Sequence, residues 1–149
     1  MLYLLDSNIL LYSKIDDAPE HRAVSKWLTA VVADPKNSIL LCETSILAFL
    51  RIGTNKRLFN PPLPLSEAQA FLDTILVRPN VQIFRPEPKI YSELLDLMDK
   101  HGLSGDITMD GHLATIAMRT GATLVTRDGD FDRFPYLKLL NPILDGSNR

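Results

Sequence analysis

The sequence predicts a three-layer α/β/α sandwich with a mostly parallel central sheet. Short apolar runs alternate along the chain with longer segments whose apolar residues recur at helical spacing. Strands that are covered on both faces of a parallel sheet are apolar throughout, so these runs need not alternate with polar residues. Regular alternation of such strands with helices is the pattern of an α/β fold. A chain of 149 residues is long enough for one domain of this kind with a substantial core.

Five strands are expected at the short apolar runs. They cover residues 2–5, 39–42, 81–84, 123–126 and, at an edge of the sheet, 137–140. Helices are expected between them, at 8–15, around 24–32, at 45–52, from 66 to just before Pro79, at 89–101 and at 109–120. Gly53, Gly102 and Gly121 are predicted to end three of these helices. Capping boxes at 17–20 and 66–69 are predicted to begin two of them.

Composition limits the class of protein more than its function. Hydrophobic residues make up 46% of the chain and charged residues 23%, which is typical of a globular domain. The formal net charge of −2 gives no evidence for nucleic-acid binding, so phosphate contacts require a local basic patch or a bound metal. No apolar run approaches the roughly 20 residues of a membrane span, and no signal peptide is evident. Cys42 is the only cysteine, which excludes an intrachain disulfide and favours a cytoplasmic location.

Acidic residues follow three of the predicted strands. Asp6 and Glu43 come directly after the first and second strands, and Asp128 follows the fourth by two residues. In open α/β sheets, ligands bind in the crevice outside the carboxyl ends of the strands. Asp110 lies three residues before Leu113, on the apolar face of its predicted helix. An unpaired buried charge there would cost on the order of several kcal/mol, so we expect all four acids to converge on one site.

A divalent metal ion explains this set of acids better than four separate turns do. Crowded carboxylates repel one another, and each raises the pKa of its neighbours, unless a cation neutralises them. Oxygen ligands without cysteine or clustered histidine favour Mg²⁺ or Mn²⁺ over Zn²⁺, and such an ion can orient a water for attack on a phosphodiester. Singly, Asp6 is also explained as a helix N-cap and Asp128 as a turn residue. Asp130 is the weaker ligand candidate, because its side chain is an alternative cap for residues 131–133.

Four further residues are candidates for supporting roles. Asn8 and Thr126 could hold Asp6 or lie beside the metal, although a helix cap and a β-branched strand end are equally good explanations. Arg51 and Arg127 could flank the cleft and contact RNA phosphates, although exposed arginines are also typical of any solvated surface. These roles depend on a surface that the sequence does not define.

Several ordered motifs together resemble PIN-domain ribonucleases, and among these most closely the VapC toxins of bacterial toxin–antitoxin pairs. The motifs are Leu5-Asp6-Ser7-Asn8, Glu43 followed by Phe49-Leu50-Arg51-Ile52, Asp110-Gly111-His112-Leu113-Ala114, and Gly121 to Asp128 with Phe131. The segment from Phe131 to Pro142 is also similar to the C-terminal end of many such toxins. The resemblance extends over essentially the whole chain and implies one PIN-like nuclease domain at 1–144, with a C-terminal tail at 145–149.

The resemblance implies acidic ligands at Asp6, Glu43, Asp110 and Asp128, with Asn8 and Thr126 as polar support. It also implies Mg²⁺- or Mn²⁺-dependent endoribonuclease activity on tRNA or rRNA, a homodimer, and a VapB-type antitoxin that blocks the cleft.

The sequence departs from the family pattern at two positions. Gly111 stands where the family usually has alanine, which costs a helix about 1 kcal/mol and predicts that this helix begins later or is locally loose. Asp106 is an additional acid one turn before Asp110, either in the metal shell or at the helix N-cap.

Three alternatives to a nuclease are open at this stage. A haloacid-dehalogenase-type phosphatase also has a catalytic Asp after its first strand, but it needs a second acid two residues later, where this chain has Asn8. A response-regulator receiver needs an acidic pair after the first strand and a lysine at a late strand, which here ends in Thr126. A catalytically inactive PIN fold that only binds a partner is disfavoured by the intact acids.

Overall fold

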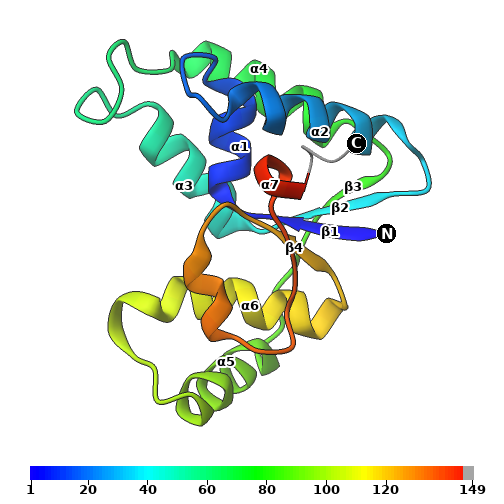
Figure 1. Ribbon diagram of the computed structural model, residues 1–149, viewed down its shortest axis with the longest axis vertical. Helices are drawn as coiled ribbons and strands as arrows, with labels where there is room; N and C mark the ends of the chain where they lie inside the picture. The colour runs from blue at the N-terminus through cyan, green and yellow to red at the C-terminus, as the bar shows by residue number, and fades with distance from the viewer. Residues whose placement is uncertain (146–149) are drawn as a thin grey trace.

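A five-stranded parallel sheet forms the centre of the computed structural model, which describes residues 1–145 (Figure 1). The strands are β1 (Leu2–Leu5), β2 (Ser38–Leu41), β3 (Val81–Ile83), β4 (Thr123–Val125) and β5 (Lys138–Leu140). Their order in the sheet is β3-β2-β1-β4-β5, and all four pairings are parallel. The predicted edge position of the last strand is confirmed.

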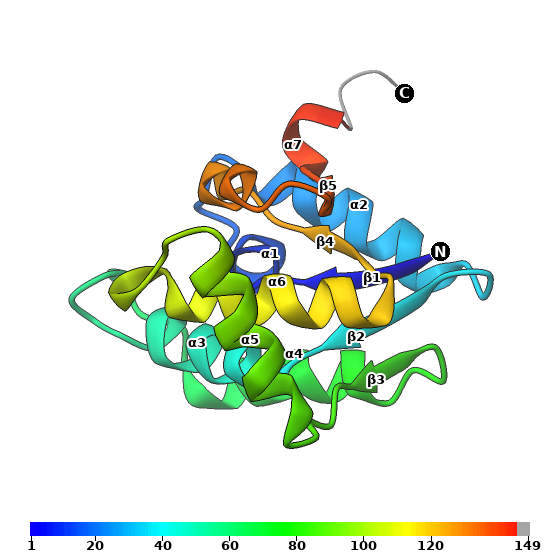
Figure 2. The same ribbon diagram turned by 90° about the horizontal axis from the view of Figure 1, so that it is seen from below.

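Helices cover both faces of this sheet, which confirms the three-layer sandwich (Figures 1 and 2). One face is covered by α5 (Lys89–Lys100) and α6 (Thr108–Thr120). The opposite face is covered by α1 (Ser7–Lys14), α2 (His21–Ala33), α3 (Glu43–Gly53), α4 (Leu65–Leu76) and α7 (Pro142–Asp145). Two 3₁₀ turns complete this part of the chain: η1 (Gly105–Ile107) directly precedes α6, and η2 (Gly129–Arg133) follows β4. Within residues 1–145, each helix is too short or too polar to span a lipid bilayer.

The apolar runs are explained by burial on both faces of the sheet. Successive side chains of a strand point to opposite faces, so Leu4 packs into the core beneath α5 and α6, whereas Leu5 packs beneath α1 and α3. Leu40 and Leu41 divide between the two cores in the same way. Neighbouring positions must therefore both be apolar, which is why these strands show no alternation in the sequence.

The direction of the strand order reverses between β1 and β4, and this point sets the position of the candidate site. From β1 the chain crosses to β2 and β3 on one side, and to β4 and β5 on the other. The backbone N–H of Asp6 donates to the carbonyl oxygen of Val125 at 3.0 Å, so the carboxyl ends of the two central strands lie side by side. Ligands in open α/β sheets bind at such a switch point.

Both predicted capping boxes are wrong, and Gly53 marks the end of its helix without the expected conformation. Neither α2 nor α4 begins with a side-chain cap, because the residues at their N-caps are Glu20 and Pro64 and the predicted boxes lie outside the cap positions. Gly53 does not end α3 in a left-handed conformation but is its last helical residue. It is buried where a Cβ would lie 3.3 Å from Leu11 and 3.6 Å from Leu63, so glycine here serves close packing.

The stops predicted at Gly102 and Gly121 are confirmed, with φ of 62° and 71°. The expectation that Gly111 delays the start of its helix is wrong, because α6 begins at Thr108 and continues through Gly111. Local looseness at Gly111 stays a prediction. A Cβ at Gly111 would lie 3.2 Å from Leu94 of α5, so the missing side chain lets α5 and α6 pack closely.

The C-terminal end of the structure includes one element that the sequence did not predict. The helix α7 spans only Pro142–Asp145, too short for a periodic pattern. The division at 144/145 between domain and tail stays a prediction, because the tail expected at 145–149 lies outside the described residues apart from the backbone of Asp145.

Candidate metal centre

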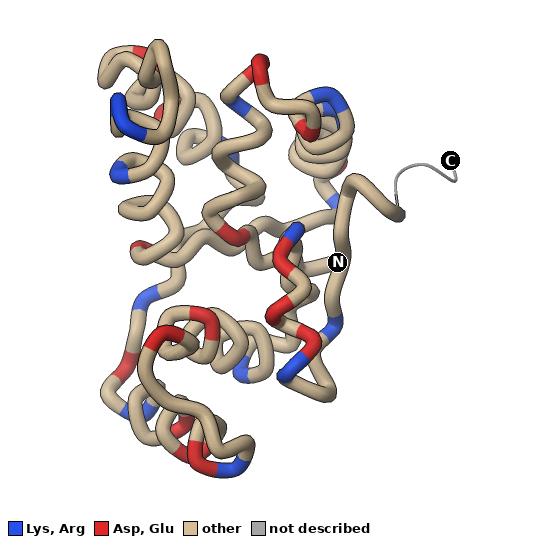
Figure 3. Tube along the Cα trace, turned by 60° about the vertical axis from the view of Figure 1, so that its left-hand side comes forward, with Lys and Arg blue, Asp and Glu red and all other residues tan. Residues whose placement is uncertain are grey.

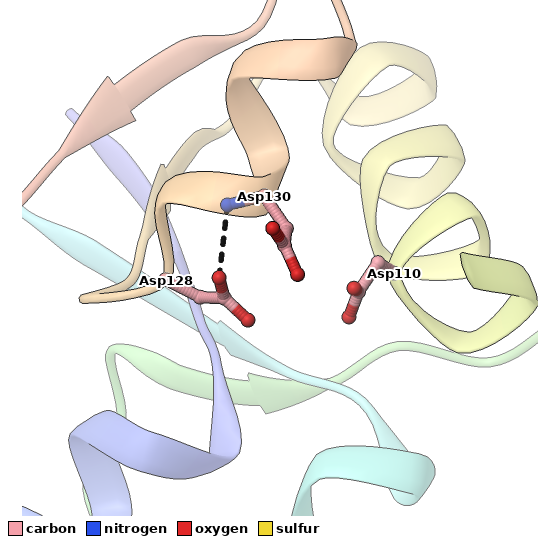
Figure 4. A group of neighbouring side chains, drawn as sticks. All are labelled: Asp110, Asp128 and Asp130. Carbon is pink, nitrogen blue, oxygen red and sulfur yellow. Dashed lines mark hydrogen bonds between the residues drawn. The ribbon is translucent and has the colours of Figure 1, made fainter. Parts of the chain in front are cut away.

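Three carboxylates from two separate parts of the chain converge at the switch point of the sheet. Each of Asp110, Asp128 and Asp130 offers a carboxylate oxygen, and these three atoms all lie within 4.8 Å of one another. Asp110 projects from the first turn of α6, whereas the other two come from the turn after β4, and the three side chains point toward one another (Figure 4). Hard oxygen donors at such spacing can be bridged by one cation.

The local structure of the Asp128-Gly129-Asp130 turn presents two acids to this cluster. Asp128 is the N-cap of η2, and its Oδ1 accepts the backbone N–H of Asp130 at 2.8 Å. The backbone N–H of Asp128 in turn donates to Thr126 Oγ1 at 3.0 Å. The suggestion that Asp130 caps residues 131–133 is therefore wrong, since Asp128 is the cap and Asp130 is left to face Asp110.

Asp6 lies beside the cluster and is held by a network of hydrogen bonds. Its Oδ1 accepts the backbone N–H of Ser7 at 2.6 Å, and its Oδ2 accepts Thr126 Oγ1 at 2.7 Å and Asn8 Nδ2 at 3.1 Å. Asp6 therefore fits both explanations from the sequence: it is the N-cap of α1, and it also lies close enough to Asp128 to feel its charge. Burial raises the pKa of Asp6, while hydrogen bonds from Thr126 and Ser7 lower it and the charge of Asp128 adds a smaller rise.

The cluster carries more negative charge than the chain neutralises. Burial, and after it the charges of Asp128, Asp6 and Asp130, together raise the pKa of Asp110 from 3.8 to about 6, against an opposing effect of Arg133. Among the described residues, none of the ion pairs involves any of these four acids. Acidic positions of η2 and of the start of α6 lie on facing segments (Figure 3). This donor set fits a divalent cation, which would remove the repulsion.

The structure does not bring Glu43 into the three-carboxylate cluster. Glu43 is exposed in the first turn of α3, where a carboxylate interacts favourably with the helix dipole, and it lines a separate pocket. Asp106 is also exposed and outside the cluster, in η1 before α6. The structure thus brings together Asp110, Asp128 and Asp130 with Asp6 nearby. A ligand role for Glu43 stays a prediction.

The two arginines predicted to contact RNA have different environments. Arg127 is half-exposed, and its guanidinium donates to the Tyr12 hydroxyl at 2.8 Å and pairs with Glu20 at 2.8 Å. The contact with Tyr12, and after it the charge of Glu20, raise the pKa of Arg127. Its backbone N–H also donates to Asn8 Oδ1 at 3.3 Å, which joins this loop to the support of Asp6. Arg51 is exposed in the last turn of α3, on the same helix face as Glu43.

Sequence reasoning underestimated one residue of the site. The sequence favours Asp130 less than the other acids as a ligand, yet it is one of the three that converge. The Asp-Gly-Asp spacing is the feature of the sequence that could have indicated this role. In such a turn the first Asp serves as the cap, so the side chain of the second Asp can face α6. Only the packing of η2 against α6 distinguishes this arrangement from an ordinary solvent-exposed turn.

Comparison with known proteins agrees with the geometry. The PIN domain family matches residues 3–136. Ribonuclease VapC31 of Mycobacterium tuberculosis is 36% identical over 145 residues, which is 96% of this chain and 100% of the relative. Ribonuclease VapC25 of the same organism is 34% identical over 143 residues, 95% of this chain and 99% of the relative.

Solved structures show the same architecture. VapBC2 from Rickettsia felis, bound to a DNA fragment from its promoter, has a TM-score of 0.68 at 26% identity, covering 95% of this chain and 98% of that chain. VapC20 from Mycobacterium tuberculosis, a Sarcin-Ricin loop cleaving toxin, has a TM-score of 0.70 at 11% identity, covering 93% and 99%, and so supports the fold alone. The family match and the identity to the VapC relatives show that this chain belongs to the PIN-domain family and, within it, to the VapC ribonucleases.

Proposed function

We propose that this chain is the toxin of a VapB–VapC-type toxin–antitoxin pair and that it hydrolyses RNA phosphodiesters as a metal-dependent endoribonuclease. The observation that carries this proposal is the meeting of Asp110, Asp128 and Asp130, beside Asp6, at the switch point of a parallel sheet. The relatives of this chain are ribonucleases by name, and the residues that meet are of the type needed for metal-assisted hydrolysis.

The ion in this proposal is Mg²⁺ or Mn²⁺. Every donor is a carboxylate oxygen, the ligand type that these hard cations prefer. Asp110 and Asp128 would hold the ion together with Asp6, whose carboxylate is held beside them by its hydrogen bonds, and Asp130 would complete the set. When bound, a divalent ion supplies a positive charge for the phosphate and lowers the pKa of water, which is the chemistry that hydrolysis of a phosphodiester needs.

The chain's own residues prepare the site for that ion. Thr126 is buried, and its hydroxyl donates to Asp6 and accepts from Asn8 Nδ2 and from the backbone N–H of Asp128. One hydroxyl thus fixes two acids from β1 and from the turn after β4. A preorganised donor set needs no rearrangement when charge develops on the substrate, which favours catalysis.

RNA is the proposed substrate, with tRNA and rRNA loops as the expected targets. Arg51 has no ion pair to another described residue and is therefore the better candidate for a phosphate contact, since Glu20 already pairs with Arg127. An RNA target makes the cytoplasm the expected site of action. A VapB-type antitoxin is the proposed partner, and a homodimer is the proposed assembly. A similar solved structure from Klebsiella pneumoniae is a toxin–antitoxin complex.

The experiment that tests this function is cleavage of a panel of tRNAs and rRNA hairpins with Mg²⁺, Mn²⁺ or EDTA. Wild type, Asp110→Asn and the matched control Asp106→Asn would be purified identically. We expect cleavage at a defined site by wild type and by Asp106→Asn, and loss of cleavage in EDTA and in Asp110→Asn. Co-expression with a VapB-type antitoxin is expected to suppress the activity.

Two outcomes would contradict the proposal. Equal cleavage by wild type and Asp110→Asn would mean that the carboxylate cluster is not the origin of the activity. Absence of cleavage together with absence of Mn²⁺ binding by calorimetry would favour a PIN fold that only binds a partner. The phosphatase and receiver alternatives are set aside by the PIN-domain family match.

A further inference from the structure

A second concave site lies on the other side of the first turn of α6 from the carboxylate cluster. It has a volume of 370 Å³, within the range of about 300–1,000 Å³ that is usual for small-ligand pockets. Its walls come from the start of α3, from the segment between β3 and the first turn of α5, and from the first turn of α6. We call it the lateral pocket and define it by Glu43, Thr44, Phe84, Tyr91, Thr108, Met109 and His112.

The lateral pocket and the cluster share one helical turn. Asp110 faces Asp128 and Asp130, whereas Met109 and His112, its near neighbours in α6, line the lateral pocket. Successive residues of an α-helix are rotated by 100°, so these side chains leave the helix on a different side from Asp110. The distance between the two sites is therefore about one helix diameter, roughly 10 Å.

The lining of the lateral pocket combines aromatic rings with polar groups. Tyr91 is 57% exposed and Phe84 is half-buried, so both offer ring surface to an incoming group. Within residues 1–145, neither the Glu43 carboxylate nor the His112 ring has a hydrogen bond or ion pair to the chain. Thr108 Oγ1 donates to the carbonyl oxygen of Gly105 at 2.7 Å and keeps its lone pairs for a ligand. Pockets that orient a ligand have this composition, mostly apolar with a few convergent polar groups.

These features distinguish between the possible occupants. A phosphate is disfavoured, because the Glu43 carboxylate would repel it. A purely aliphatic side chain from a protein partner would bury the polar groups of Glu43 and His112 without hydrogen bonds, which is costly. A nucleobase satisfies both requirements, because its face stacks on an aromatic ring and its edge carries donors and acceptors. Recognition of single-stranded RNA commonly uses unstacked bases in this way.

We propose that the lateral pocket binds one unstacked nucleobase of the RNA, from a nucleotide that flanks the cleaved bond, with Tyr91 as the stacking residue. This inference rests on the proposed ribonuclease function and adds a determinant of where the RNA is cut. The metal centre acts on the phosphodiester, which is the same at every position, so the choice of position needs a contact to a base.

The first test is binding of single nucleotides to metal-free wild-type protein in EDTA. Each of the four nucleoside 5′-monophosphates would be titrated while the Met109 methyl signal is followed by NMR. Met118, at the far end of α6 and 46% exposed, is the matched control. We expect at least one nucleotide to shift Met109 and not Met118, and the shift to be lost in Tyr91→Ala. No shift of Met109 with any of the four nucleotides would contradict the proposal.

The second test is RNA cleavage by Tyr91→Ala, with Tyr91→Phe and Leu95→Ala as controls. Leu95 is 66% exposed one turn further along α5 and does not line the lateral pocket. We expect Tyr91→Ala to lower kcat/KM about tenfold through KM and to relax the choice of cleavage site, because one base–aromatic stack is lost. Tyr91→Phe, which keeps the ring, and Leu95→Ala should cleave like wild type.

The two proposals fail in different ways. If wild type cleaves RNA and Tyr91→Ala cleaves at the same sites with the same KM, the lateral pocket is not a base site, while the ribonuclease function stands. If Tyr91→Ala weakens binding of a VapB-type antitoxin peptide but no nucleotide shifts Met109, the occupant is a protein side chain and the proposal is overturned. If wild type cleaves no RNA with Mg²⁺ or Mn²⁺, the ribonuclease function fails and this inference fails with it.

Discussion

Replacement of Asp110 by asparagine is expected to stabilise the metal-free protein at neutral pH. The folded state raises the pKa of Asp110 from its ordinary value of 3.8 to about 6. A difference of two pKa units corresponds to about 3 kcal/mol of unfavourable interaction for the ionised form. Because Asp110 is only half-buried, solvent screening reduces this to about 1 kcal/mol. Asparagine removes the charge with little change in shape, so this cost disappears.

The pH dependence of this effect has a defined sign. A carboxyl whose pKa is raised in the folded state binds its proton more tightly there than in the unfolded chain. The favourable contribution of protonated Asp110 is fully present below about pH 4 and is lost as the pH rises through about 6. In EDTA, the melting temperature of Asp110→Asn should therefore exceed that of wild type at pH 7.5 by about 2–4 °C, and the difference should vanish near pH 4.

Differential scanning calorimetry in EDTA at pH 4, 5.5 and 7.5 measures this difference. Asp106→Asn is the control, because it removes one exposed acid near the start of α6 without touching the cluster. Its melting temperature should stay within about a degree of wild type at each pH, since surface substitutions of this kind cost little. A lower melting temperature for Asp110→Asn than for wild type at pH 7.5 in EDTA would refute the repulsion argument.

Three further predictions follow from the same contacts. Mn²⁺ at a hundred times its dissociation constant should stabilise wild type by about 2.7 kcal/mol in thermal unfolding and should leave Asp110→Asn unchanged; equal stabilisation of both would place the ion elsewhere. Thr126→Val should destabilise the protein by about 1–3 kcal/mol in urea unfolding, because three groups lose the hydroxyl that they contact, whereas Thr126→Ser should stay near wild type. Arg51→Ala should weaken RNA binding more than Arg127→Ala in a salt-dependent filter assay, because Glu20 already pairs with Arg127; unchanged affinity in both would exclude these contacts.

Most of the fold was predictable because a parallel sheet leaves a strong pattern in the sequence. Leu4 and Leu5 are both apolar because each faces a different core, and runs of this kind defined every strand to within about one residue. The two wrong caps show the limit of local pattern. Ser66 and Gln69 satisfy the box motif, but α4 begins one residue earlier at Leu65, so Ser66 lies inside its first turn and not at the N-cap.

The type of site, a set of carboxylates for a metal ion, was easier to predict than the residues that form it. Asp6, Asp110 and Asp128 could be found from strand ends and helix faces, since topology alone directs them to one edge. The sequence does not predict that Asp130 joins the carboxylate cluster while Glu43 lies outside it. This difference depends on how η2 packs against α6 and on where α3 begins, and both are tertiary contacts between segments far apart in the sequence.

The central claim is that the carboxylates at the switch point hold a divalent ion, and the position of bound Mn²⁺ tests it most directly. Crystals of the wild-type protein grown with Mn²⁺ would give an anomalous difference peak at each bound ion. The account predicts a peak between the carboxylates of Asp110 and Asp128, within coordination distance of Asp6 or Asp130, and no such peak in Asp110→Asn. Mn²⁺ bound only elsewhere on the molecule, with these carboxylates free of metal, would contradict it.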